Sequence, residues 1–121
     1  MGVEHRAVVM KELKLPHAKQ THEVCFEPVS GCVFVSQMSN SVLVRVPVGP
    51  DGLLLDDQDA WLVGELDPAT GDGITGLHNI SLSYKHPGCL WLSLQFANTL
   101  VLVDGRTMQV CTCTHEPTHT R

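Results

Sequence analysis

Two histidines occupy matching places in this 121-residue sequence and carry side chains that can do chemistry near neutral pH. His22 and His78 each precede an apolar segment, and Glu23 and Asn79 follow them directly. An imidazole titrates near pH ~6.5, so it can shuttle a proton or contact a ligand. We therefore take His22, His78 and Glu23 as candidate catalytic residues, and His22, His78 and Asn79 as candidate ligand contacts. A hydrogen bond that recurs in each repeat and holds a loop is the structural alternative.

A second cluster lies near the C-terminus, where Cys111, Cys113, His115 and His119 are all residue types that bind zinc. Zinc ligands must converge, because a thiolate binds the metal at about 2.3 Å. Residues two apart on an extended strand stand about 6.6 Å from one another, and no second closely spaced cysteine pair completes the set. The spacing favours a strand end with a loose tail over a zinc site.

The remaining acidic and cysteine residues favour structural roles. The acidic stretch 56–59 lacks the spacing, the glycine and the distal glutamate of a calcium loop, so we expect a solvated turn. Cys25, Cys32 and Cys89 fall in apolar segments, where a free cysteine commonly acts as a small buried hydrophobe. Five cysteines, an odd number used in this way, favour a reducing, cytoplasmic compartment.

The elements that must position these residues form an internal repeat. Residues 31–46 and 88–103 share one order: a glycine, an apolar strand, a polar break and a second apolar strand. The offset drifts from 56 to 58, which requires two one-residue insertions. Repetition of this kind indicates a repeat architecture. The matched pairs are His22 with His78, Gly31 with Gly88, Cys32 with Cys89, Ser36 with Ser93, and Asn40 with Asn98.

Strand alternation assigns two faces to each copy of the repeat. One face carries a cysteine, an aromatic residue and a serine, and the other carries aliphatic residues. Because both faces are apolar, we expect these strands to be buried on both sides. Phe34 and Trp91 should then lie in the core, whereas Trp61 should sit half exposed in an outer strand.

Four short strands per repeat are typical of propeller blades. The sequence predicts an all-β chain of about two four-stranded antiparallel blades, an incomplete propeller. Residues 1–20 should form an N-terminal strand and loop, the outer strand of a preceding blade. Residues 21–73 should form the first blade, 74–114 the second, and 115–121 a flexible tail.

The second copy carries a more specific resemblance. The order His78-x-Ile80, then GCLWLS at 88–93, then ANTLVLVD at 97–104 resembles blades of the virginiamycin B lyase (streptogramin lyase) family. NHL and YVTN repeats are similar more loosely. The likeness covers about residues 21–110 and implies a fold more than a chemistry, since many functions share such blades.

In the lyase family, the resemblance implies a metal-assisted elimination with His and Glu residues around magnesium. A Glu often follows the aromatic strand there, but this chain has Gln37 and Leu94, and neither is a base. We therefore expect a ligand- or protein-binding scaffold without a complete active site. Two alternatives stay open: a magnesium-dependent lyase for a cyclic lactone or ester, completed by further blades or copies, and a small zinc-binding β protein.

Length and charge restrict the partners. A closed propeller needs at least four blades, so two blades require other blades of a longer protein or self-association. A small-molecule ligand is compatible with either. The net charge is −5 and the basic residues are scattered, unlike a nucleic-acid footprint. No apolar run approaches the ~20 residues of a membrane span, and the N-terminus does not resemble a secretory signal.

Overall fold

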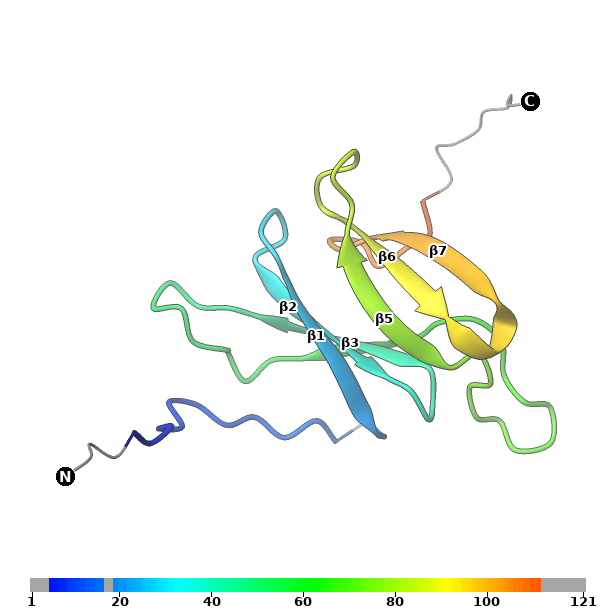
Figure 1. Ribbon diagram of the computed structural model, residues 1–121, viewed down its shortest axis with the longest axis horizontal. Helices are drawn as coiled ribbons and strands as arrows, with labels where there is room; N and C mark the ends of the chain where they lie inside the picture. The colour runs from blue at the N-terminus through cyan, green and yellow to red at the C-terminus, as the bar shows by residue number, and fades with distance from the viewer. Residues whose placement is uncertain (1–4, 17–18, 112–121) are drawn as a thin grey trace.

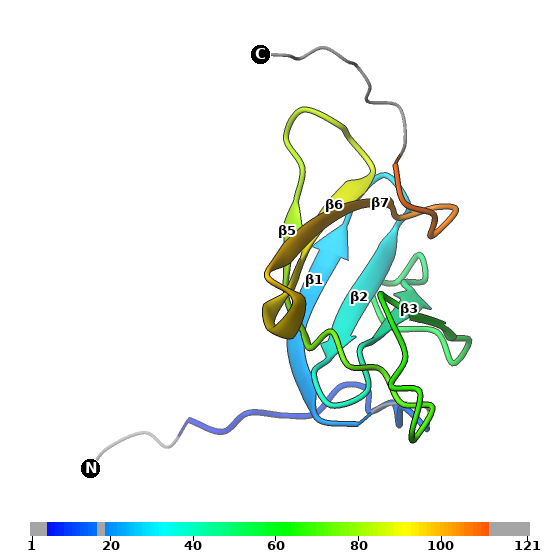
Figure 2. The same cartoon turned by 90° about the vertical axis from the view of Figure 1, so that its right-hand side faces the viewer.

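The computed structural model describes residues 5–16 and 19–111, and these form two stacked antiparallel β-sheets (Figures 1 and 2). The only helical turn in the described ranges is a 3₁₀ turn at Gln95–Ala97. The all-β prediction is therefore confirmed. Sheet 1 has the order β1 (Thr21–Glu27), β2 (Cys32–Gln37), β3 (Val42–Pro47) and β4 (Asp59–Leu62). Sheet 2 has the order β5 (Leu77–Leu82), β6 (Cys89–Leu94) and β7 (Thr99–Asp104).

The two sheets repeat each other down to single hydrogen bonds. The Val48 amide donates to the Gly31 carbonyl, and the Gly105 amide donates to the Gly88 carbonyl. Both acceptor glycines adopt a positive φ, which a residue without Cβ accepts easily. A second pair of equivalent hydrogen bonds lies where each sheet begins. The Met38 amide donates to the Gln20 carbonyl in sheet 1, and the Gln95 amide donates to the Gly76 carbonyl in sheet 2.

The structure corrects one alignment within the repeat. Ser41 and Asn98, with φ of 57° and 51°, are the left-handed residues that precede β3 and β7. The match of Asn40 with Asn98 is therefore wrong by one residue, and a constant offset of 57 holds from Gly31 onward. Only one insertion separates the copies. Residue identity alone aligns Asn40 with Asn98, whereas the shared left-handed turn conformation aligns Ser41 with Asn98.

The inner faces of the two sheets make the main core. Phe34 and Leu43 of sheet 1 are fully buried against Leu90 and Leu92 of sheet 2. Phe34 is thus a core residue as predicted. Trp91 is not: it is 41% exposed, because its side of β6 faces away from sheet 1. Alternation predicts that face correctly, but no other part of the described chain covers it fully.

Two further expectations differ from the structure. The strand expected within residues 6–15 does not form; Leu13 and Leu15 instead pack against Val44 and its neighbours on the far side of sheet 1. Within residues 19–111, sheet 2 has three strands where four were expected; the end of the expected second blade (112–114) and the expected tail (115–121) lie outside the described residues. A single bridge from Val110 to Val103 extends it. A lone bridge lacks the ladder of hydrogen bonds that defines a strand.

The repeat yields a stability prediction at Gln37, whose counterpart in sheet 2 is Leu94. Gln37 is fully buried, and within the described residues its Nε2 has no hydrogen-bond partner. An unsatisfied buried donor costs about 1–3 kcal/mol. Gln37→Leu removes this donor but also the hydrogen bond that Gln37 Oε1 accepts from Thr21 at 2.9 Å, so we expect it to raise the free energy of unfolding by about 1 kcal/mol in denaturant titrations. The reverse change in sheet 2, Leu94→Gln, should lower the free energy of unfolding by about 3 kcal/mol. Equal effects of the two substitutions would contradict the conclusion that Gln37 buries an unsatisfied donor.

Candidate functional site

The structure brings the two matched histidines together. The ring centroids of His22 and His78 lie 4.1 Å apart with the planes tilted by 46°, where the first strand of each sheet begins. The His78 ring also contacts the side-chain oxygen of Asn79. These three predicted ligand contacts therefore share one edge of the stack. Glu23 lies beside them on β1 and is half-buried.

Both strands carry the same irregularity at this edge. Pairing of β1 with β2 shifts between Thr21 and Val24, and pairing of β5 with β6 shifts between Leu77 and Asn79. At each shift a serine hydroxyl takes the place of a backbone acceptor. Such a bulge redirects nearby side chains, and here it accompanies the two histidines. The hydroxyls belong to Ser36, which accepts from the Glu23 amide, and to Ser93, which accepts from the Asn79 amide, each at 3.0 Å.

Ser36 and Ser41 form what we call the inner docking site, because they bind the backbone of sheet 2. Ser36 Oγ donates to the His78 carbonyl at 3.0 Å. Ser41 Oγ accepts from the amides of Thr75 and Gly76 at 3.1 and 2.9 Å. Both serines are fully buried. The inner docking site thus recognises two amides and one carbonyl at the start of β5.

The repeat places a second set of such groups on the outer face of sheet 2. Ser93 is the counterpart of Ser36, and Asn98 is the counterpart of Ser41. They line a hollow of about 350 Å³, which we call the outer hollow. Sequence reasoning identified His78 but missed the role of these two residues. The outer hollow is lined by His78, Ser93, Leu94, Gln95, Asn98, Thr99 and Leu100.

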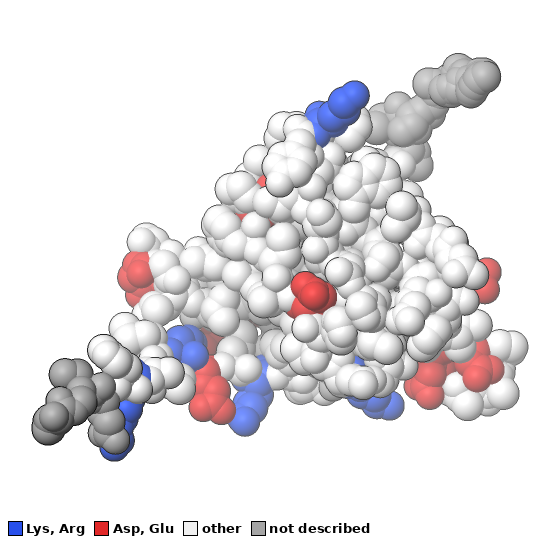
Figure 3. Space-filling view, in the orientation of Figure 1, with Lys and Arg blue, Asp and Glu red and all other residues white. Residues whose placement is uncertain are grey.

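The surface around this hollow is nearly free of charge. Residues 77–103, which include β5 and β6, contain one charged residue, Lys85. The space-filling view shows a mostly uncharged face, with one acidic side chain near its middle and most other charged side chains toward the periphery (Figure 3). An uncharged, partly apolar surface suits a polypeptide or other uncharged group better than an anion or a nucleic acid.

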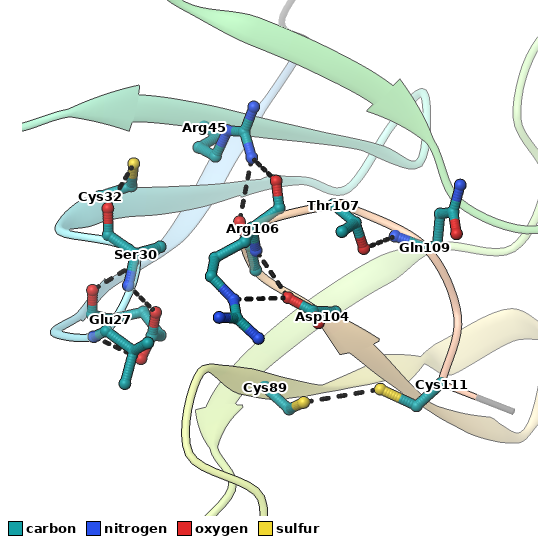
Figure 4. Close-up of polar contacts among 12 residues, drawn as sticks. Glu27, Ser30, Cys32, Arg45, Cys89, Asp104, Arg106, Thr107, Gln109 and Cys111 are labelled. Atoms are coloured by element: carbon teal, nitrogen blue, oxygen red, sulfur yellow. Dashed lines mark hydrogen bonds and ion pairs between the residues drawn. The ribbon is translucent and has the colours of Figure 1, made fainter. Parts of the chain in front are cut away.

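The far end of the stack is held by Arg45 on β3. Its guanidinium donates to the carbonyls of Gly105 and Arg106 in the turn after β7 at 3.0 and 2.7 Å (Figure 4). It also pairs with Asp59 at 2.9 Å and lies over the Trp61 ring at 4.7 Å. Trp61 is half-buried as expected. The acidic stretch 56–59 therefore serves ion pairs, since Asp56 contacts Lys11 in the same way at 2.8 Å.

The donors present do not fit the magnesium ion that the family resemblance implies. Magnesium requires oxygen ligands in near-octahedral geometry. The histidine edge offers nitrogen from His22 and His78 and oxygen from Glu23 and Asn79. In the described ranges no group of three or more His, Cys, Asp or Glu side chains could hold a metal. This set of donors therefore supports no reaction step through magnesium.

The predicted zinc ligands fall mostly outside the described part of the chain. Cys113, His115 and His119 lie beyond residue 111. Cys111 is described, and its sulfur lies 3.5 Å from that of Cys89 (Figure 4). Cys25 on β1 is poorly suited as a nucleophile. Burial raises the pKa of its thiol, and the charges of Glu27 and Glu23 raise this pKa further.

Glu27 caps the turn between β1 and β2. Its carboxylate accepts hydrogen bonds from the amides of Val29 and Ser30 at 2.9 and 2.6 Å (Figure 4). Burial raises the pKa of this carboxyl, but the hydrogen bonds from Ser30 and Val29 and the charge of Arg106 outweigh it and leave the pKa below its usual value. Ser83 is the counterpart in sheet 2, where its hydroxyl accepts from His86.

Comparisons with known proteins identify no relative. The chain matches no protein-family profile, no curated protein and no solved structure. Among the described residues no helix has the length and apolar character needed to cross a bilayer. The site must therefore be interpreted from its geometry.

The Glu27 contacts predict an acid-sensitive fold. Because the pKa is lower in the folded chain than in the unfolded chain, the carboxylate stabilises the fold above the unfolded pKa of about 4.3. This contribution is lost as the pH falls through the folded value. We expect Glu27→Gln to lower the free energy of unfolding at pH 7 by about 1–2 kcal/mol and to flatten its decline in acid. The exposed Glu65→Gln is the control; the same flattening there would exclude Glu27 as the cause.

The sulfur contact predicts a specific disulfide. Oxidised glutathione should accept two electrons and two protons from Cys89 and Cys111, giving one disulfide bond and two molecules of reduced glutathione. Peptide mapping by mass spectrometry should recover the linked pair. Cys32, which is buried, should remain a thiol. A different predominant pairing would contradict the geometry.

Proposed function

We propose that sheets 1 and 2 are successive blades of a propeller-type repeat, resembling the virginiamycin B lyase family in architecture. The strand order and the hydrogen bonds repeated from one sheet to the next support this. So does the packing, in which β5 approaches β1 and β2 most closely (Figure 1). Blades of a propeller meet in this way, with their first strands closest to the centre.

On this basis the chain acts as a binding scaffold that recognises polypeptide backbone through the outer hollow. The observation that carries the proposal is the repeat of hydrogen-bonding groups. Ser36 and Ser41 bind backbone amides and a carbonyl within the chain, and Ser93 and Asn98 present equivalent groups on the outer face. Main-chain recognition with adjacent apolar contacts is a common way to bind an extended peptide. His78, whose ring contacts that of His22, lines the same hollow.

A peptide copied from the chain tests this proposal. Residues 72–83 (DGITGLHNISLS) contain the backbone groups that the inner docking site binds. We expect this synthetic peptide, titrated into isotope-labelled protein, to shift the NMR signals of Ser93, Asn98 and the Trp91 indole. NMR titration detects millimolar affinities, which suits an unconstrained peptide that must order itself on binding.

Two controls define the outcome. A scrambled peptide of the same composition should leave these signals unchanged. Leu100→Glu should abolish the shifts, because Leu100 lines the hollow and a buried, unpaired carboxylate is costly. Shifts that are equal for both peptides, or that cluster away from the hollow, would refute peptide recognition at this site.

A further inference from the structure

The exposed apolar residues of sheet 2 have buried counterparts in sheet 1. Trp91 is 41% exposed and Leu100 is 69% exposed on the outer face of sheet 2. Their counterparts Phe34 and Leu43 are fully buried where sheet 2 covers sheet 1. The outer face of sheet 2 is therefore built as a surface onto which another sheet packs.

The opposite end of the stack shows the complementary surface. Val24 and Phe26 on β1 are 66% and 49% exposed on the outer face of sheet 1. Their counterparts on β5 are Ile80 and Leu82, which pack into the core between the sheets. The outer face of sheet 1 thus carries the type of surface that covers an inner docking site.

The backbone groups at the start of β1 also correspond to those that the inner docking site binds at the start of β5. Gln20, with φ of 61°, begins sheet 1 with the left-handed turn that Gly76, with φ of 69°, makes at the start of sheet 2. The amides of residues 19 and 20 correspond to those of residues 75 and 76, which Ser41 binds. The carbonyl of His22 corresponds to that of His78, which Ser36 binds.

From these three correspondences we infer that the chain associates head to tail with a second copy of itself. This inference rests on the proposed recognition of backbone by the outer hollow. The outer face of sheet 1 of one copy covers the outer face of sheet 2 of the next. Asn98 accepts the amides of residues 19 and 20, and Ser93 donates to the carbonyl of His22. The two faces are unlike, so the contact is heterologous and extends to a ring or a filament.

Two features limit the contact to part of each face. Leu13 and Leu15 already cover the β2 and β3 side of sheet 1 and leave the β1 side open. The counterpart of Arg45 is Leu102, so the outer face of sheet 2 lacks the guanidinium that fastens the stack within one chain. We therefore expect association to be reversible and concentration-dependent.

Complementation between two variants tests the direction of assembly. Trp91→Glu disables the outer face of sheet 2, and Val24→Glu disables the outer face of sheet 1. In sedimentation velocity the mass of the wild-type chain should rise with concentration, and each variant alone should stay monomeric. A carboxylate in the contact should weaken it roughly a hundredfold or more. An equimolar mixture should form a 1:1 dimer that grows no further, because each variant retains one intact face.

Further variants separate loss of contact from loss of fold. Leu100→Glu and Phe26→Glu should reproduce the two classes and complement one another, and circular dichroism should report unchanged β structure in all four. Leu66→Glu is the matched control, since Leu66 is half exposed in the loop before β5 and belongs to neither face. It should associate as the wild-type chain does.

Each remaining outcome overturns the inference. A wild-type chain that stays monomeric at every concentration excludes it, as does a Val24→Glu variant that still dimerises, which would mean that like faces meet. A mixture that fails to restore the dimer also excludes it. If the 72–83 peptide still binds the outer hollow in any of these cases, peptide recognition survives and only the second copy as its occupant fails.

Discussion

The contact between sheet 1 and sheet 2 is the interaction on which the rest of this structure depends. Phe34 fills its centre, and Ser36 and Ser41 fasten one end by binding the backbone at the start of β5. Arg45 fastens the other end through two carbonyls after β7. Neither sheet could bury its apolar residues alone, because a small antiparallel sheet needs a partner layer to form a core.

This contact is asymmetric, because the two sheets contribute different chemical groups to it. Serine hydroxyls on one sheet meet backbone groups on the next, so the two faces of each sheet differ in chemistry. A stack built this way ends in two unlike surfaces and not in two copies of one surface. The proposed recognition of backbone therefore uses the same kinds of hydrogen bond that join the two sheets.

Some positions of the repeat carry different residue types in the two sheets, and these positions distinguish the sheets chemically. Arg45 gives way to Leu102, Gln37 to Leu94, and Glu27 to Ser83. In each of these pairs the residue in sheet 1 is charged or more polar than its counterpart in sheet 2. Sheet 1 thus carries the Arg45–Asp59 ion pair and the acid-sensitive cap at Glu27, whereas residues 77–103 of sheet 2 contain a single charged residue, Lys85. The histidines at 22 and 78 are retained in both.

Much of the fold was predictable from residue order. Glycines before β2 and β6, apolar alternation and matched histidines predicted paired strands in two similar sheets, and the structure has them. The sequence also matched His22 with His78 as counterparts in the repeat, and the structure brings their rings together. It did not identify Ser93 and Asn98 as site residues, because a serine or asparagine after an apolar strand is common in turns and carries no sign of its partner.

The sequence by itself determined which side chains share a face, since alternation along a strand is a local property of the backbone. Only the tertiary structure decided which faces are covered. Phe34 and Trp91 hold the same place in the repeat, yet one is buried and the other is half exposed. Burial depends on what lies across the sheet, and that neighbour comes from a distant part of the chain. The expected N-terminal strand is absent for a related reason: Leu13 and Leu15 pack across the face of sheet 1, a contact with residues distant in the sequence that strand alternation does not predict.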